Sequence, residues 1–276
     1  MLEGFIVLYF RVIAENEALF LTVFSILVVS DIVLILRRIR SKKSLIRDLP
    51  SRLIGNNFFI AYAVYVIALQ KREFLTYTAE TPIVLPLVRG LVAFTFLILG
   101  ASYLIRKEVR VSARGFGERL FPFFCAILPI AVNEAETVRW ALWVQSHHSL
   151  AALFTPWGVF PSAPWGPLTT ISLLFGNILI VWSLISLRHS FSIMAEVREI
   201  VSSGPYRFVR HPIYLGQFFS TIGCCLLAPS WANSFLLVIF FIAQTTRARF
   251  EEKKLVSASP TYREYQKRTG FFLPGL

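Results

Sequence analysis

The sequence predicts an all-α membrane protein with about seven transmembrane helices. Of its 276 residues, 55% are hydrophobic and only 16% are charged, and the mean hydropathy is +0.62. A soluble domain carries roughly a quarter charged residues, so this composition indicates a chain embedded in a bilayer. The net charge of +12 could suggest a nucleic acid partner. The charges gather at the ends of apolar segments, however, which is typical of integral membrane proteins, and we expect no nucleic acid partner.

Seven apolar segments are candidate spans, because about 20 apolar residues are needed to cross a hydrocarbon core of ~30 Å. They are Leu19–Leu36, Ile54–Leu69, Ile83–Ile105, Leu120–Val132, Leu168–Leu187, Leu215–Ala228 and Trp231–Thr246. The last two segments are separated only by Pro229-Ser230, so we expect a tight helical hairpin there.

Lys and Arg residues predict the orientation of these spans. The segments 37–53, 106–119, 188–213 and 247–276 hold 23 of the 28 basic residues. The positive-inside rule places them in the cytoplasm, which puts the N-terminus outside and the C-terminus inside. No transit or retention signal is apparent, and we expect a bacterial inner membrane protein. His147-His148 has no Cys or carboxylate at metal-ligand spacing, so we expect no metal site.

Two polar clusters flank the predicted hairpin. The first is the loop from Gly204 to Tyr214, and the second is the run from Arg247 to Glu252. Charged groups beside hydrocarbon are costly to desolvate, so clusters in this position suggest a functional site. The alternative is that the loop arginines only set the topology and that the second run is an ordinary solvated helix face.

The residue types in these clusters suit recognition of an anion and of a cation. Pro212 fits the first position of a helix, which places His211 near the N-cap and its free backbone N–H groups. Tyr206 and Tyr214 supply aromatic faces that attract a cation. Arg247 and Glu251 share a helical face at i,i+4, and an Arg fork binds both oxygens of a carboxylate.

The C-terminal tail is expected to cover this loop. Ser259-Pro260 is typical of an N-cap followed by a first helical position, which predicts a short helix from Thr261 to Arg268. This helix presents Tyr262 and Tyr265 among charged residues.

Five motifs follow one another in the C-terminal part of the chain, and their ordered series is more specific than any one of them. They are Leu187-Arg188-His189-Ser190-Phe191-Ser192, Ile200-Val201-Ser202-Ser203-Gly204-Pro205-Tyr206, Arg210-His211-Pro212-Ile213-Tyr214, Glu251-Glu252-Lys253-Lys254-Leu255 and Pro260-Thr261-Tyr262-Arg263-Glu264-Tyr265. This series resembles the isoprenylcysteine carboxyl methyltransferase family, which lies within a wider group of membrane methyltransferases that includes phospholipid methyltransferases. The resemblance covers about residues 168–274.

The resemblance implies that S-adenosylmethionine is held at the cytoplasmic face by the loop and the tail. Arg247 would hold the carboxylate of the methyl acceptor. The residues implied to contact the cofactor are Arg198, Glu199, Ile200, Val201, Tyr206, His211, Pro212, Ile213, Tyr214 and Glu251. Arg198 and Glu199 depart from the family pattern, because members that act on prenylated proteins usually have a His in this segment.

The sequence therefore predicts two regions, residues 1–167 with about four spans of unassigned role and residues 168–276 with a methyltransferase-like site. The leading hypothesis is methyl transfer to a lipophilic acceptor that enters from the bilayer. The acceptor group that we favour is a carboxylate. One alternative is an NADPH-dependent reductase of a sterol-like lipid, in which Arg207, Arg210, Arg247 and Arg249 would bind the extra phosphate. Another is a non-catalytic membrane scaffold. The oligomeric state is not readable from the sequence.

Overall fold

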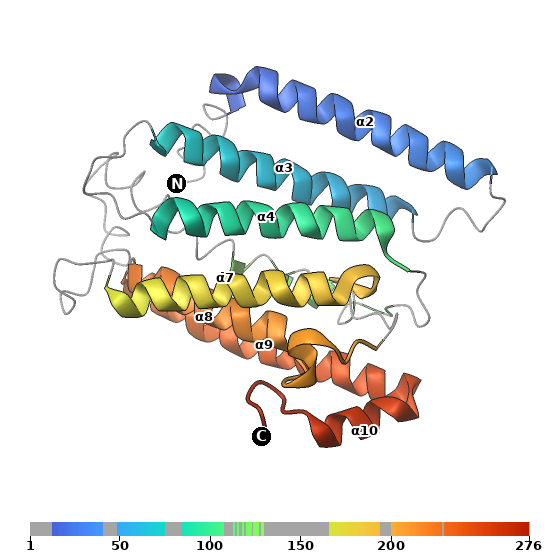
Figure 1. The fold of residues 1–276 in the computed structure, drawn as a ribbon, viewed down its shortest axis with the longest axis vertical. Coiled ribbons are helices and arrows are strands. Elements are labelled where there is room, and N and C mark those ends of the chain that lie inside the picture. Colours follow the sequence, from blue (N-terminus) through green and yellow to red (C-terminus); the bar gives the residue numbers. More distant parts are fainter. Residues whose placement is uncertain are drawn as a thin grey trace. The chain divides into compact units, whose positions relative to one another are not determined.

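The computed structural model describes residues 13–40, 49–74, 84–107, 166–193, 200–227 and 229–275, together with some of the residues between 113 and 129. Its helices, drawn in Figure 1, are α2 (Glu17–Arg40), α3 (Leu49–Phe74), α4 (Val84–Ile105), α7 (Pro167–Leu187), η1 (Arg188–Ser190), η2 (Gly204–Arg207), α8 (Pro212–Leu227), α9 (Trp231–Ala258) and α10 (Pro260–Arg268).

Among the described residues every element is helical, apart from one isolated parallel bridge between Val209 and Gly270. The predicted all-α class is therefore confirmed. Contacts divide the chain into one unit within Ile6–Glu108 and a second that comprises mainly Val109–Leu276.

Four described helices are long and apolar enough to cross a membrane. They contain the segments Glu17–Leu36, Arg52–Lys71, Pro86–Ile105 and Pro167–Ser190. The last predicted hairpin corresponds to α8, a shorter apolar helix, and to the first part of α9. At 1.5 Å per residue, the 28 residues of α9 extend about 42 Å, which is more than a hydrocarbon core requires. The total of seven spans stays a prediction.

In the N-terminal unit, α3 lies along α4, and α2 contacts α3. Tyr103 of α4 packs close to the backbone of Gly55 in α3, where an added Cβ would come within 2.2 Å of the ring. Asn57 donates to the carboxylate of Asp31 at 2.8 Å, which links α3 to α2. A hydrogen bond between polar side chains of two apolar helices stabilises their association within a membrane.

In the C-terminal unit, α7 and α8 lie side by side with their backbones in close approach (Figure 1). A Cβ added to Gly176 of α7 would lie 2.4 Å from the backbone N of Ser220 and 2.6 Å from the carbonyl O of Gly216. Next to this contact, Asn177 donates to the Ser220 hydroxyl at 3.0 Å. Small residues at a helix crossing allow such close packing in membranes. The α7–α8 pair therefore holds both ends of the loop that connects these two helices.

Helix α7 also carries large exposed apolar side chains at helical spacing. They are Leu168, Ile171, Phe175, Ile178, Trp182 and Ile185. A stripe of this kind on a long apolar helix is what a lipid-facing surface requires.

A segment that precedes α7 packs along α9 in the antiparallel direction. Lys254 pairs with Glu118, and the rings of Phe250 and Phe121 lie 6.0 Å apart. Cys125 contacts the carbonyl of Ala243 at 3.6 Å. Residue numbers fall along α9 as they rise in this segment, and its described residues between 118 and 129 are helical. The predicted span Leu120–Val132 thus has a helical part that belongs to the C-terminal unit.

The close approach of α7 and α8 gives a direct test. We expect Gly176→Ala to destabilise the protein by roughly 1–3 kcal/mol, because the added methyl group meets backbone atoms that cannot move aside easily. The matched control is Gly90→Ala in α4, where nothing lies within 4 Å of the added Cβ. This control should be neutral or stabilising by up to about 1 kcal/mol. Thermal unfolding in detergent measures both, and equal midpoints for the two variants would contradict the packing.

Candidate functional site

The loop after α7 begins with a turn that requires glycine. Gly204 has φ of +61°, a conformation that L residues with side chains rarely adopt. A Cβ at this position would also lie 2.3 Å from the hydroxyl of Ser186 near the end of α7. Pro205 and Tyr206 follow in the short helix η2 and are buried. The glycine therefore lets the turn sit directly against α7.

Helix α8 starts where the sequence predicts. Pro212 is its first residue, and the carbonyl of His211 accepts from the backbone N–H of Leu215 at 3.0 Å. His211 itself is buried. Its ring is stacked on that of Tyr214, with the centroids 5.5 Å apart and the planes 5° from parallel. The start of α8 thus fixes both side chains relative to each other.

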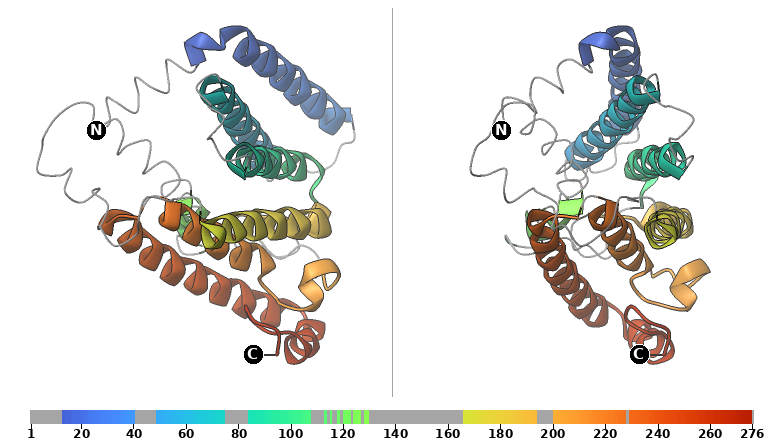
Figure 2. Two further views of the ribbon diagram at one scale, coloured as in Figure 1. Left: turned by 60° about the vertical axis from the view of Figure 1, so that its left-hand side comes forward. Right: turned by 90° about the vertical axis from the view of Figure 1, so that its left-hand side faces the viewer.

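The C-terminal tail pairs with the backbone of this loop. Arg210 donates its backbone N–H to the carbonyl of Gly270 at 2.8 Å, and Gly270 donates to Phe208 at 3.3 Å. The next residue, His211, donates its backbone N–H to Phe271 at 3.3 Å. Helix α10 packs against the end of α9 (Figure 2), and the residues that follow α10 reach the loop.

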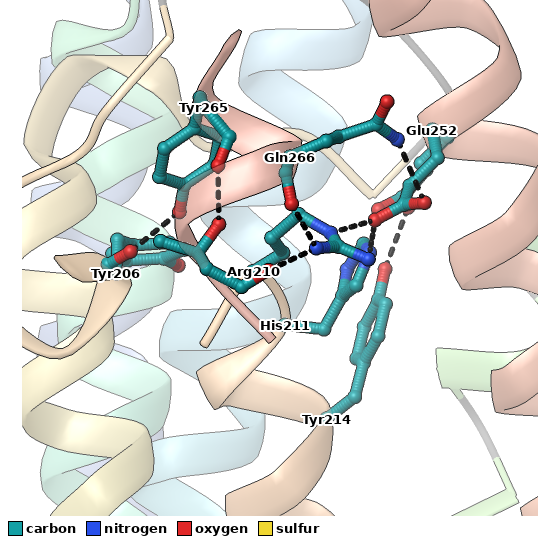
Figure 3. Close-up of polar contacts among 9 residues, drawn as sticks. Tyr206, Arg210, His211, Tyr214, Glu252, Tyr265 and Gln266 are labelled. Atoms are coloured by element: carbon teal, nitrogen blue, oxygen red, sulfur yellow. Dashed lines mark hydrogen bonds and ion pairs between the residues drawn. The ribbon is translucent and has the colours of Figure 1, made fainter. Parts of the chain in front are cut away.

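One carboxylate lies at the junction of loop and tail, and Figure 3 shows it facing donors from both. Glu252 of α9 accepts from Arg210 Nε at 2.5 Å and from Gln266 Nε2 at 3.0 Å. Its Oε1 also lies 3.2 Å from His211 Nε2. Arg210 in turn donates from Nη1 to the carbonyls of Gln266, at 3.0 Å, and Thr269. Both the loop and the tail are therefore fastened to α9 through Glu252.

The tail also contacts the buried turn that contains Tyr206. The hydroxyl of Tyr265 donates to the carbonyl of Tyr206 at 2.5 Å (Figure 3). Burial raises the pKa of Tyr265 to about 12. The Thr269 hydroxyl donates to the carbonyl of Tyr265 at 2.7 Å and continues the network along the tail.

The neighbouring carboxylate, Glu251, belongs to a different cluster. It accepts from the Tyr214 hydroxyl at 2.6 Å and from Arg247 Nε at 3.1 Å. Arg247 also donates from Nη2 to the carbonyl of Ile193 at 2.7 Å, and its guanidinium lies 5.2 Å from the centroid of the Tyr214 ring. Only 5% of the Arg247 side chain is exposed. The predicted Arg247–Glu251 pair is thus present at i,i+4.

Apolar residues enclose these two clusters from one side. Tyr214, Phe218, Phe240 and Ala248 form a buried group, against which Leu128, Ile213, Phe271 and Phe272 pack. The ring of Phe271 lies 4.8 Å from that of His211. Electrostatic interactions inside such a group are strengthened because water is excluded from it.

The structure brings together Tyr206, His211, Tyr214, Arg247 and Glu251 from the predicted site. Pro212 and Ile213 lie at the start of α8 beside them, and Ile200 and Val201 lie in the irregular stretch before Gly204. Arg198 and Glu199 fall outside the described residues. The roles of all ten predicted cofactor contacts and of Arg247 stay predictions.

Sequence reasoning missed the residues that hold the site together. Glu252 was visible only as the second member of a Glu pair, and Arg210 was considered as a phosphate ligand. Their bond joins residues 42 positions apart, and no periodicity signals a contact at that distance. Cys125 and Leu128 also lie against the site from a segment that precedes the recognised motifs. No group of three potential metal ligands occurs in the described part of the chain, and His147-His148 lies outside it.

The fold and the site define a helical integral membrane protein whose polar loop and C-terminal tail meet on one long helix. Residues 167–261 match the sequence model of the phospholipid methyltransferase family. The match confirms the resemblance to membrane methyltransferases over this region, which holds α7, α8, α9 and the start of α10.

Individual relatives are each similar to 28–31% of the chain. The protein-S-isoprenylcysteine O-methyltransferase of Saccharomyces cerevisiae is 36% identical over 96 residues, which cover 31% of this chain and 39% of that protein. The cobalt-zinc-cadmium resistance protein CzcN of Cupriavidus metallidurans is 35% identical over 78 residues, or 28% of this chain and 36% of that protein. The nickel-cobalt-cadmium resistance protein NccN of Alcaligenes xylosoxydans is 30% identical over 79 residues, or 28% and 37%. The matches span little more than a third of each relative's length.

The Glu252 contacts predict an acid-dependent stability. Burial opposes ionisation of this carboxyl, but hydrogen bonds and charge from His211 and Arg210 outweigh it and lower its pKa below the ordinary 4.5. A carboxyl whose pKa is lower in the folded state stabilises the fold above the unfolded-state value and loses this effect as the pH falls through the folded-state value. We therefore expect Glu252→Gln to lower the unfolding midpoint at neutral pH, and the difference from wild type to shrink below about pH 4.5.

Thermal unfolding of both proteins across this range checks the prediction. The control is Glu264→Gln, which alters an exposed pair with Lys267 and should follow wild type throughout. A constant difference between wild type and Glu252→Gln at every pH would show that this carboxylate is not stabilised by its neighbours.

Proposed function

We propose that the protein is an integral-membrane methyltransferase that transfers the methyl group of S-adenosylmethionine to the carboxylate of a lipophilic acceptor. The observation that carries the proposal is the cluster of Tyr214, Arg247 and Glu251 beside the buried His211, within the region that matches membrane methyltransferases. Four apolar helices of spanning length support a location in the membrane.

The residues of the site fit the chemistry of the cofactor. S-adenosylmethionine supplies a methyl group that its sulfonium makes electrophilic, and it also carries an amine, a carboxylate and ribose hydroxyls. The Glu251 carboxylate can accept from an amine or a hydroxyl. The ring of Tyr206 can stabilise a cation by roughly 0.5–2 kcal/mol, depending on desolvation. The ring of Tyr214 already lies 5.2 Å from the Arg247 guanidinium. The N-terminus of α8, next to His211, favours an anionic group.

Arg247 is suited to hold the acceptor. It is almost fully buried, which strengthens its interaction with a carboxylate, and its position is fixed by Glu251 and by the carbonyl of Ile193. A carboxylate is already ionised near neutral pH and needs no general base. The task of the protein is then orientation and exclusion of water, each of which lowers the barrier by several kcal/mol when reacting atoms are well aligned.

The acceptor is proposed to arrive through the bilayer. The apolar first part of α9 leads directly to Arg247, and its exposed side carries Trp231, Phe235, Val238 and Ile242. A lipophilic molecule can follow such a surface while its carboxylate remains near the polar end of the helix. We place the C-terminus in the cytoplasm, where the cofactor is available, because most basic residues gather on that side of the predicted spans. We also propose that the membrane is a bacterial inner membrane.

Reduction by NADPH receives less support from the geometry. It would require arginines to bind the additional phosphate, yet Arg210 already donates to Glu252 and to two backbone carbonyls of the tail.

Calorimetry on the protein in lipid nanodiscs tests the cofactor. We expect saturable binding of S-adenosylmethionine that an excess of NADPH does not displace. Glu251→Gln should weaken it by roughly 10- to 100-fold, because a hydrogen bond to a charged group contributes about 1.5–3 kcal/mol. Glu264→Gln on α10 is the matched control and should bind as wild type does. Binding of NADPH in place of S-adenosylmethionine would contradict the proposal.

The acceptor is tested with two probes, an S-prenylated cysteine with a free carboxylate and a long-chain fatty acid. Transfer of a labelled methyl group to either probe is measured in wild type and in Arg247→Ala. We expect the variant to lose transfer more strongly than it loses cofactor affinity. Loss of cofactor binding with unchanged acceptor affinity would reverse the roles assigned to Arg247 and Glu251.

A further inference from the structure

The hydrogen-bonding neighbours of the Glu252 carboxylate come from two distant segments of the chain. Arg210 and His211 belong to the loop before α8, whereas Gln266 lies on α10. Only 14% of the Glu252 side chain is exposed. A carboxylate offers about four acceptor positions, and three of these are directed at side chains of the protein itself.

The chemistry of this contact assigns a proton on the ring of His211. An ionised carboxylate can only accept hydrogen bonds, so the ring nitrogen that faces it must carry the hydrogen. In the structure this nitrogen is Nε2, at 3.2 Å from Oε1. In the neutral form of the ring, the other nitrogen, Nδ1, is then the acceptor.

Arg210 binds groups of the protein itself, although its position in the loop suggested a ligand for phosphate. Its guanidinium donates to Glu252 of α9 and to the carbonyls of Gln266 and Thr269, so its donors are directed at α9 and at the tail. Its Cζ also lies 5.6 Å from the centroid of the Phe271 ring. The fork geometry of Arg is needed to reach a carboxylate and two carbonyls at once, and a Lys ammonium cannot reproduce it.

We propose that Glu252 and Arg210 are positioning residues for the cofactor site, in which Glu252 holds the His211 ring with Nε2 protonated and Arg210 holds Glu252 and the tail. Neither residue touches the cofactor. The inference rests on the proposed function for the role of His211 in binding S-adenosylmethionine, but the assignment of the ring proton does not depend on it.

A double-mutant cycle tests whether Glu252 acts through His211. Binding of S-adenosylmethionine is measured in nanodiscs for wild type, Glu252→Gln, His211→Ala and the double variant. We expect Glu252→Gln to weaken binding about tenfold or more in the wild-type background, as for a charge-assisted hydrogen bond. In the His211→Ala background the same change should weaken it less than about threefold, since coupled residues are not additive.

Equal effects in both backgrounds would overturn the proposal, because Glu252 would then act independently of the ring. Glu264→Gln again serves as the control for a Glu→Gln change in the tail region and should be additive with His211→Ala. The unfolding midpoint of each variant without ligand separates a loss of the fold from a loss of the site.

A spectroscopic measurement without cofactor tests the ring directly. The chain has four His residues, so nitrogen-15 labelled histidine gives a simple spectrum in which His211 is assigned by its absence from His211→Ala. In mildly alkaline buffer we expect a ring protonated at Nε2 in wild type and a changed tautomer balance in Glu252→Gln. A wild-type ring protonated at Nδ1 alone would contradict the proposal, even if Glu252→Gln could not be purified.

The two measurements also separate the two proposals. If wild type does not bind S-adenosylmethionine, the proposed function fails while the tautomer still decides the role of Glu252. If wild type binds it and the cycle is additive, the proposed function stands and the positioning role of Glu252 is wrong.

Discussion

The bond network around the Glu252 carboxylate is the constraint on which the rest of the site depends. Neither the loop nor the tail has enough local structure to hold itself in place. The loop contains only the short helix η2, and α10 has nine residues, fewer than an isolated helix needs to be stable in water. Glu252 ties both to α9 through three donors. Removing it would leave the largely buried Arg210 guanidinium without its carboxylate, which is more costly than the loss of one bond.

The second feature of the site follows from the geometry of α9. Successive residues on a helix point about 100° apart, so the adjacent Glu251 and Glu252 serve different neighbours. Glu251 faces Tyr214 and Arg247, whereas Glu252 faces Arg210 and His211. One uninterrupted helix thus carries an exposed apolar surface, then the Arg247–Glu251 pair, and then the anchor of the covering tail. Any rotation of α9 would disturb both clusters together.

Local chemistry allowed much of this to be predicted from the sequence. Proline preferences placed the starts of α8 and α10 correctly, at Pro212 and Pro260. Helical spacing gave the Arg247–Glu251 pair, and apolar length gave the four spanning helices. The anchoring role of Glu252 was missed because it depends on contacts across the chain, and a Glu pair near basic residues is usually a solvated surface. The packing of the segment near Cys125 against α9 was missed for the same reason.

The central claim is that the loop is held by the tail through Glu252, and hydrogen exchange of backbone amides measures this most directly. The amides of Arg210 and His211 donate to the tail at Gly270 and Phe271. Their exchange should be slow in wild type and much faster in Glu252→Gln, while amides in the middle of α7 keep their rates, since local opening sets exchange. Exchange of Arg210 and His211 that is as slow in Glu252→Gln as in wild type would contradict the account.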